Sequence, residues 1–566
     1  MRPIPLTARK AGAALAVLML STALTARQPQ ASAVSATTPA SAPAPTAQAS
    51  APADNATGSS GSSQSDVPQE LESFYSQTID WQDCSDGTSP FQCGTVTVPL
   101  DYEHPDGRTI TLALKKLPAS DSDAEHGSLF LNPGGPGGSG VEAVASAPGV
   151  PEELRAAYDI IGFDPRGVGQ STPITCWTDD EIRQSLTDPG DDAGPTDPLK
   201  GVTSTNTPAQ NKIDRGTANA ARCAQHSEVP ELLDHVGTRN VARDMDVLRA
   251  TNGNATLNYL GISYGTHIGA VYADLFPSRV GRVVLDSAVD PSKREIDRNA
   301  ETVAFKEGVL RQYVEHCQTQ SDCPLTGSTD EAIAQLTAFV DGLDQAPLTA
   351  PDSSATVNTQ DAIGIIQQHA VAQPDWDALT AMLTPAMTNH DGTLMVKAKQ
   401  NSPDLSPETT VEEVVSQANE QIMLAAVICN DNPDTGSTAS EWDAQAAAEK
   451  KTSPFFGGTS SAMDAYCRGW GHPGKTPPQE THAKGSAPIL VVGITGDVQT
   501  LYSWAQSLAG QLDNGHLFTV EGYGHGGAIG SCASAATIGF LVNGTVPAEG
   551  ATCTAEPRQA AGGAAG

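Results

Sequence analysis

The chain has 566 residues and a formal net charge of −34 at pH 7, which argues against a nucleic-acid partner because phosphate binding needs a basic surface. Hydrophobic residues make up 39% of the chain and aromatic residues only 5%, beside 53 glycines and 40 prolines. This composition is typical of a loop-rich globular protein and excludes a coiled coil or a membrane protein with many spans. The length suits one large α/β domain with an insertion, or two ordinary domains.

The N-terminal residues have the order of charges and apolar residues that a secretory signal requires. Arg2, Arg9 and Lys10 precede the apolar run "AGAALAVLMLSTAL", and small residues follow it. The run is shorter than the roughly 20 residues of a transmembrane helix. We therefore expect residues 1–33 to be a signal peptide, with a single-pass anchor as the alternative, and no membrane span after cleavage.

Residues 34–66 consist almost entirely of Ala, Pro, Ser, Thr, Gly and Gln. Such a segment cannot bury enough apolar surface to offset the entropy of ordering its backbone. We predict a disordered linker here, and a secreted or extracytoplasmic protein that the linker could tether near a cell wall.

All ten cysteines follow the linker, and an even number in a chain with an export signal predicts disulfides. Joining neighbours along the chain would give the pairs 84–93, 176–223, 317–323, 429–467 and 532–553, although the sequence alone leaves the connectivity open. No Cys-x-x-Cys pair with clustered histidines is present, so we expect no metal site.

A β-hairpin is predicted over residues 92–118, where apolar and polar residues alternate on both sides of a turn. Short apolar runs that end in glycine-rich or acidic turns follow, for example "SLFLNPGG", "YDIIGFDPRG" and "APILVVGITGD". Helical patterns such as residues 240–251 separate several of these runs. This alternation predicts a mostly parallel sheet that helices cover on both faces.

The strand pattern is interrupted between Asp286 and Pro488, where several helical patterns occur and strand signals are few. We predict an α/β core of residues 67–289 and 486–556, a largely helical cap over residues 290–485, and a disordered tail over residues 557–566. A separate second domain is the alternative to an inserted cap.

The stretch "LNYLGISYGTHIGAVYADLF" contains a Gly-x-Ser-x-Gly motif at Ser263, after an apolar strand-like run and before a helical pattern. In a nucleophile elbow the serine lies on a strained strand-to-helix turn, and flanking glycines leave room for the tight crossing. We therefore predict that Ser263 is a nucleophile, with a structural loop serine as the alternative.

A serine nucleophile needs a histidine base and an acid, and α/β hydrolases place them in the order Ser, Asp, His. Asp497 ends the strand-like run "APILVVGITGD", and His525 lies in the glycine-rich "VEGYGHGG" after the last strand-like run. We predict a triad of Ser263, Asp497 and His525. Asp286, which also ends a strand, is the second choice for the acid, or else a loop cap.

Two other histidines fit the pattern less well. His267 follows Ser263 by one helical turn and is expected to point away from the hydroxyl as a packing or surface residue. His235 precedes the nucleophile and so breaks the order.

An oxyanion hole needs backbone N–H groups aimed at the developing charge. The glycine-rich turn in "FLNPGGPGGSG" directly follows a predicted strand. We assign one N–H donor to this turn, preferring Gly137 to Gly135, and the other to Tyr264. An ordinary loop is one alternative. A phosphate-binding turn is a weaker one, because no Gly-Lys-Ser/Thr follows.

Several spaced motifs, "NPGGPGGSG", "GFDPRGVGQS", "GISYGTHIGAVYADLFP", "RVVLDSAVDP" and "GYGHG", resemble the secreted tripeptidyl-aminopeptidase-like α/β hydrolases, relatives of the prolyl aminopeptidases. The resemblance covers most of residues 75–555. It implies an α/β-hydrolase fold with a cap inserted before the acid, hydrolysis of short peptides from a free N-terminus, and the triad positions given above.

The chain departs from this family pattern in two places. At Asp497 the family often has Asp-Pro-x-Thr-Pro, whereas this chain has "DVQTL", which keeps Asp497 and Thr500 but lacks both prolines. Pro133 stands where prolyl relatives often have histidine, so their detailed specificity does not transfer. Glu301, Glu307 and Glu315 are candidates for binding a substrate amine by location only, and we expect each to be solvated at the surface.

The sequence therefore predicts an exported serine peptidase of short peptides that works through an acyl-enzyme without a cofactor or metal. A carboxylesterase or lipase of the same fold is the alternative, although a lipase lid should be more apolar than "KQNSPDLSPETT". An inactive hydrolase fold used for binding would normally have lost a triad member. The oligomeric state is left open.

Overall fold

The computed structural model describes residues 67–555, except 86, 88, 122–125, 147–149, 188–205, 352, 373 and 401–409. The predicted signal peptide (1–33), linker (34–66) and tail (557–566) lie outside the described residues. In the part of the chain that is described, no helix combines the length and apolarity needed to cross a membrane.

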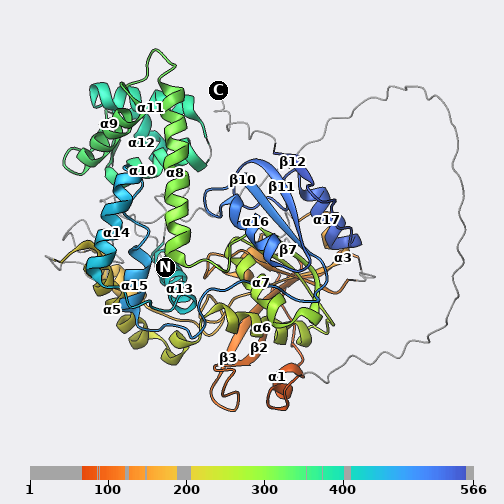
Figure 1. Ribbon diagram of the computed structural model, residues 1–566. Coiled ribbons are helices and arrows are strands. Elements are labelled where there is room, and N and C mark those ends of the chain that lie inside the picture. The colour runs from red at the N-terminus through yellow and green to blue at the C-terminus, as the bar shows by residue number, and fades with distance from the viewer. Residues whose placement is uncertain are drawn as a thin grey trace, which may run out of the picture.

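The ten strands of the main sheet, counted over the described residues, have the order β1-β2-β3-β5-β4-β6-β7-β10-β11-β12 (Figure 1). The pairs β1–β2, β2–β3 and β3–β5 are antiparallel. All the remaining neighbours in this order are parallel. The strands are β1 (Gln82–Asp83), β2 (Gln92–Pro99), β3 (Thr109–Leu117), β4 (Ser128–Asn132), β5 (Asp159–Phe163), β6 (Leu257–Ile262), β7 (Val280–Asp286), β10 (Ile489–Gly496), β11 (Gly515–Tyr523) and β12 (Thr552–Thr554). The predicted hairpin and the mostly parallel sheet are confirmed.

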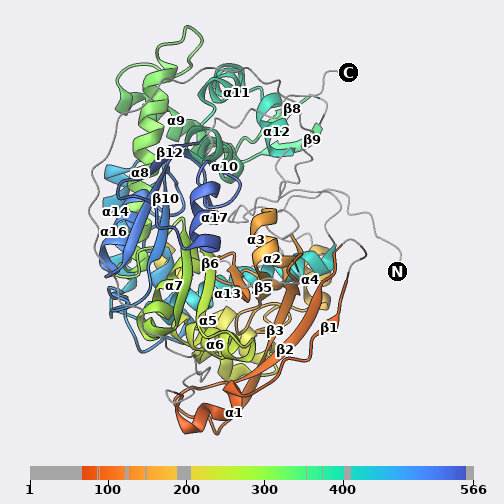
Figure 2. The same ribbon diagram turned by 90° about the vertical axis from the view of Figure 1, so that its right-hand side faces the viewer.

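Helices cover both faces of the sheet (Figure 2). One layer contains α1 (Glu72–Tyr75), α6 (Thr238–Thr251), α7 (Tyr264–Leu275) and α16 (Tyr502–Gln511), and the other contains α2 (Gly140–Ala145), α3 (Glu152–Ala157) and α17 (Ser534–Asn543). Helix α6 illustrates why these helices pack on the sheet. Its apolar residues Val241, Met245 and Leu248 recur at helical spacing, so they form one face, and that face is buried in the first layer. Val144 and Leu541 belong to the separate apolar cluster of the second layer.

Most cap helices form a lobe beside the sheet (Figure 1). The helices after β7 are α8 (Glu295–Cys317), α9 (Thr329–Asp341), α10 (Thr359–Gln367), α11 (Trp376–Asn389), α12 (Thr393–Gln400), α13 (Val411–Asp431), α14 (Ala439–Thr452) and α15 (Ala462–Trp470), with the short strands β8 (Leu348–Ala350) and β9 (Ser353–Val357). Helices α8 to α12 enclose their own apolar core, which Val498 from the hydrolase part joins.

Helix α13 differs from helices α8 to α12 because its apolar residues pack into the core of the α/β part, as does Trp470 of α15. Ile422, Met423 and Val427 belong to the same buried cluster as helices α6 and α7. Helix α5 (Pro208–His226), which precedes the predicted cap, packs along α15, and α4 (Asp179–Thr187) lies against α13. The helical cover of the core therefore draws on residues from both sides of the predicted insertion boundary.

The five disulfides found in the described residues join Cys84–Cys93, Cys176–Cys223, Cys317–Cys323, Cys429–Cys467 and Cys532–Cys553. This is the pairing of sequence neighbours considered above, and it fits a protein that folds in an oxidising compartment. Each bridge closes a short or medium loop, so no bridge joins the two separated parts of the α/β core.

Candidate active site

Ser263 lies on a sharp turn between β6 and α7. Its backbone has φ 57° and ψ −124°, a left-handed conformation that costs a residue with a side chain about 1–3 kcal/mol. A Cβ on Gly261 would lie 2.5 Å from the carbonyl oxygen of Gly265, and a Cβ on Gly265 would lie 2.8 Å from the carbonyl oxygen of Asn132. The predicted strand, turn and helix around Ser263 are confirmed, and the two glycines have no room for side chains.

Hydrogen bonds to the neighbouring strand hold this turn in place. The Ser263 N–H donates to the Asp286 carbonyl at 2.9 Å, and the Thr266 hydroxyl donates to the Ser263 carbonyl at 2.6 Å. Since the Ser263 N–H is used, the first N–H free of helical acceptors in α7 belongs to Tyr264. This N–H also lies at the positive end of the helix dipole, where a developing negative charge is favoured.

Asp497 and His525 follow the ends of adjacent strands. Gly496 of β10 pairs with Tyr523 of β11, so the residues just beyond them meet at one edge of the sheet. His525 Nδ1 lies 2.9 Å from Asp497 Oδ2 and 3.1 Å from Oδ1. The arrangement leaves the other ring nitrogen, Nε2, as the one available to a serine hydroxyl.

The Asp497 carboxylate is fully buried and has further donors besides the imidazole. The N–H groups of Gln499 and Thr500 donate to Oδ1 at 2.9 and 3.0 Å, and the Thr500 hydroxyl donates to Oδ2 at 2.9 Å. Burial alone would lower the pKa of His525, but the hydrogen bond and charge of Asp497, with a smaller contribution from Asp286, raise it above its ordinary value.

Asp286 is buried at the end of β7, between β6 and β10. Its two oxygens accept the N–H groups of Gly527 and Ala528 at 2.9 and 2.8 Å, and the neighbouring Ser287 hydroxyl accepts the N–H of Gly526 at 2.9 Å. Burial raises the pKa of Asp286 to about 6, against the effect of those two N–H donors. Asp286 therefore contacts the backbone after His525, which is the loop-cap role that was the alternative for this residue.

The glycine-rich turn packs directly against the elbow. A Cβ on Gly134 would lie 2.5 Å from the Ile262 carbonyl oxygen, 2.8 Å from the Tyr264 nitrogen and 3.0 Å from the Ser263 Cβ. A Cβ on Gly137, the predicted donor, would instead lie 3.2 Å from the Met423 Cβ of helix α13. The turn is thus enclosed between the elbow and α13, a neighbour that no sequence pattern identifies.

His267 is buried beside Tyr264, with the two ring centroids 5.1 Å apart in an edge-on arrangement. Burial lowers the pKa of His267 to about 4, so the ring is neutral at physiological pH. The expectation that His267 is a packing residue is confirmed.

The three glutamates named by location have different surroundings. Glu301 pairs with Lys293 and accepts the Trp504 Nε1–H, and Glu315 is exposed. The expectation of a solvated residue is wrong for Glu307, which is 3% exposed and accepts the N–H groups of Phe455 and Phe456. Its position on the inner side of α8 places it in the cap core.

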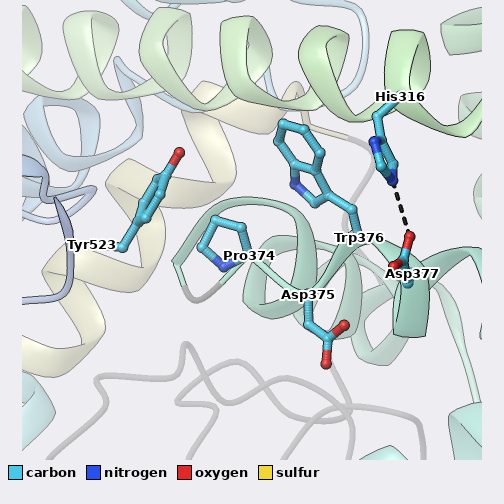
Figure 3. A pocket seen from close by; sticks show the side chains of 6 residues that line it. All are labelled: His316, Pro374, Asp375, Trp376, Asp377 and Tyr523. Carbon is cyan, nitrogen blue, oxygen red and sulfur yellow. Dashed lines mark hydrogen bonds and ion pairs between the residues drawn. The ribbon is translucent and has the colours of Figure 1, made fainter. Parts of the chain in front are cut away.

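An open pocket of about 340 Å³ lies between the cap and the strand end before His525 (Figure 3). The cap supplies His316 from α8 and the segment 374–377 at the start of α11, and the core supplies Tyr523, which is 51% exposed. The Asp377 carboxylate is already hydrogen-bonded to His316. Tyr523 is two residues from His525, and no sequence pattern predicts that it lines a pocket with cap residues.

No group of three or more His, Cys, Asp or Glu side chains suited to a metal ion occurs in the portion of the chain that the structure describes. The fold and a serine on a strained strand-to-helix turn define the class of protein as an α/β hydrolase. Family models agree: residues 127–382 match the "alpha/beta hydrolase fold" model, and residues 453–553 match the model described as "TAP-like protein".

Curated relatives identify the family. The tripeptidyl aminopeptidase of Streptomyces coelicolor is 33% identical over 85% of this chain and 87% of its own length. The serine protease Hip1 of Mycobacterium tuberculosis is 30% identical over 84% of this chain and 91% of its own length. Carboxylesterase B of the same species is 30% identical over 82% of this chain and 86% of its own length. The chain belongs to the tripeptidyl aminopeptidase family of serine peptidases within the α/β-hydrolase superfamily.

Proposed function

We propose that this enzyme is an exported serine peptidase that releases short peptides from a free N-terminus, with Ser263, Asp497 and His525 as its catalytic triad. The observation that carries the proposal is the 2.9 Å contact between His525 Nδ1 and Asp497 Oδ2. Asp286 at the end of β7 bonds both to the loop after His525 and to the Ser263 N–H, and so joins this pair to the elbow. The similarity to the tripeptidyl aminopeptidase supports the peptide substrate.

The chemistry follows from these positions. His525 Nε2 takes the Ser263 proton as the Oγ attacks the scissile carbonyl carbon, and Asp497 stabilises the imidazolium that forms. The N–H groups of Tyr264 and Gly137 donate to the oxyanion. Collapse of this intermediate breaks the C–N bond, and the amine leaves with the proton from His525. Water then attacks the acyl-enzyme with His525 as base and restores Ser263.

Export is supported by two independent features. The first 33 residues have the composition of a secretory signal, and all ten cysteines are paired in disulfides. The full chain should therefore appear in the medium or cell wall fraction of an expressing bacterium, and a chain that starts at residue 34 should stay in the cytoplasm.

The test of the activity compares the protein with Ser263→Ala on three reporters: a free tripeptide amide, its N-acetylated form and a short-chain aryl ester. We expect rapid cleavage of the free peptide only, and loss of that activity in the variant. The exposed Ser73 provides a matched control, because Ser73→Ala should retain full activity. Equal cleavage of the acetylated peptide would refute the requirement for a free N-terminus, and undiminished turnover by Ser263→Ala would refute the nucleophile.

A carboxylesterase is the second candidate, because carboxylesterase B has similar identity and coverage. It would use the same triad, so the choice depends on the acyl donor. Hydrolysis of the aryl ester without cleavage of either peptide would favour this candidate over the peptidase.

A further inference from the structure

Helix α13 of the cap ends at Asp431, whose carboxylate contacts the residue that follows the predicted nucleophile. Asp431 Oδ2 accepts a hydrogen bond from the Tyr264 hydroxyl and another from the Thr238 hydroxyl at 2.6 Å. Oδ1 accepts the Thr238 N–H at 2.9 Å. Three donors from the α/β core therefore converge on one carboxylate of the cap.

The phenol of Tyr264 is a permanent donor in this cluster. Tyr264 is 5% exposed, and its burial together with the adjacent Asp431 raises its pKa well above the ordinary value. The hydroxyl is therefore protonated at physiological pH and can donate to Asp431. A hydrogen bond to a charged acceptor is stronger than one between neutral groups, so Asp431 fixes the position of this side chain.

Fixing the Tyr264 side chain also fixes its backbone N–H, because both belong to the first residue of α7. That N–H is the predicted oxyanion donor, and a donor works only if it is aimed within a few tenths of an ångström at the developing charge. The Ser263 N–H is held by the Asp286 carbonyl of β7, whereas the Tyr264 hydroxyl is held by Asp431 of α13. Asp431 thus restrains the donor from the side that the sheet does not reach.

The same helix contacts the other side of the predicted oxyanion hole. Met423 Cβ lies 3.2 Å from the position of a Cβ on Gly137, and Glu420 and Leu424 contribute backbone atoms at 3.4 and 3.3 Å. Gly137, Tyr264 and Val427 of α13 line one small cavity. Met423 and Asp431 are eight residues apart on α13, about 12 Å along its axis, so one rigid helix contacts both predicted donors.

Helix α13 is itself held at this end. Cys429, two residues before Asp431, is joined to Cys467 of α15. The Asn430 side chain donates to the backbone carbonyls of Asp234 and His472 at 3.3 Å. The carboxylate of Asp431 therefore projects from a fixed point, which a positioning group requires.

We propose that Asp431 is a positioning residue for catalysis: through the Tyr264 hydroxyl it orients the Tyr264 N–H toward the oxyanion, and so makes the catalytic rate depend on cap helix α13. The inference rests on the proposed function for the identity of the nucleophile and the donors. The Asp431 carboxylate acts through its hydrogen bonds to Tyr264 and Thr238, so we expect its loss to affect the transition state and not substrate binding.

The experiment measures kcat and KM of the full-length mature enzyme and of Asp431→Asn, Tyr264→Phe and the double variant. Asparagine at position 431 keeps the shape of the aspartate side chain but places an NH₂ group against the Tyr264 or Thr238 donors. Phenylalanine at position 264 removes the hydroxyl and keeps the ring. We expect each single change to lower kcat by about 10- to 100-fold and to change KM by less than about 2-fold. The double variant should be no slower than the slower single variant, because both changes remove the same hydrogen bond.

A second readout separates positioning from general damage to the fold. A peptide boronic acid that forms a tetrahedral adduct on the serine should lose affinity by the same factor as kcat, while a product peptide should bind unchanged. The matched control is Asn419→Ala on the same helix, which removes the contacts of Asn419 Oδ1 with the N–H groups of Cys176 and Trp177. This control should lower the melting temperature and leave kcat within about 2-fold.

The proposal is overturned if folded Asp431→Asn has unchanged kcat, if Asn419→Ala loses as much, or if kcat falls while the boronic acid binds as before. All rates are measured on the tripeptide amide and on the aryl ester. An enzyme that cleaves only the ester would refute the peptidase proposal and would still test Asp431 through its kcat on the ester. If Ser263→Ala remained active, the proposed function would fail first, independently of any result with Asp431.

Discussion

Strands β7 and β10 lie side by side, and each ends in or just before a buried aspartate, yet the two carboxylates have different partners. Asp497 accepts from the imidazole of His525, whereas Asp286 accepts from the backbone of the two residues that come after Gly526. Both groups act on the same loop, one on its side chain and one on its main chain. The role of an aspartate at the end of a strand thus depends on the group that it contacts. Its position in the sequence does not specify that group.

The sharpest test of this difference is Asp497→Asn. The amide cannot hold the imidazole in the tautomer that accepts the Ser263 proton, so we expect kcat to fall by about 10⁴-fold with a small change in KM. Steady-state kinetics on the tripeptide amide measure the loss. A loss below about 10-fold would assign the acid role to another residue.

Asp286→Asn should have a smaller effect. Its NH₂ group would face an N–H donor of Gly527 or Ala528, so the loop should shift and kcat should fall by about 100-fold, with a loss of about 1–3 kcal/mol in the free energy of unfolding for the unpaired buried group. Urea denaturation and kinetics measure the two effects. The matched control is Asp274→Asn, which removes a similar carboxylate from the N–H groups of His482 and Ala483 and should leave kcat unchanged.

Thr500→Val removes a single donor from Asp497 and leaves the two backbone donors. The hydroxyl lies 2.9 Å from Asp497 Oδ2 and 3.4 Å from His525 Nδ1. We expect kcat to fall by about 10-fold, which corresponds to about 1.4 kcal/mol. Thr500→Ser keeps the hydroxyl and should restore most of the rate; a serine variant as slow as the valine variant would contradict this role.

The pH profile provides the finest comparison of the two acids. Only the neutral imidazole accepts the Ser263 proton, so kcat/KM should fall as the pH drops through the pKa of His525. Negative neighbours stabilise the imidazolium, and the midpoint should therefore lie above 6.5. Asp286→Asn removes one of those charges and should move the midpoint to lower pH, whereas Asp274→Asn should not. A midpoint that stays in place would show that the Asp286 charge does not reach the ring.

The fold and the elbow could be predicted from the sequence because their signals are local. Strands β4 to β7 and β10 to β11 appear as apolar runs, and the Gly-x-Ser-x-Gly motif specifies a turn within five residues. The placement of Asp497 and His525 followed from chain order. These features depend on neighbours in sequence or on the alternation of strands and helices, which a single chain displays.

The contacts that join distant segments could not be predicted in the same way. Asp431 and Tyr264 are 167 positions apart, and the Thr217 hydroxyl of α5 bonds to the Gly469 carbonyl of α15 across 252 positions. No periodicity links such partners, because their approach depends on the packing of whole helices. The burial of Glu307 was missed for the same reason: its surface is covered by residues 455 and 456 from a distant loop.

The strand order has a consequence for the synthesis of the protein. Strand β7 pairs with β6 on one side and with β10 on the other. Its second edge stays unpaired until the ribosome has made the whole segment from Asp286 to Ile489. An unpaired strand edge is prone to associate with other chains, so the nascent protein carries an open edge while the roughly 200 residues between these two strands are made. The same delay separates Asp497 and His525 from the Ser263 elbow until the last strands are added. Under the proposed triad, we expect a chain truncated before β11, which lacks His525, to be inactive.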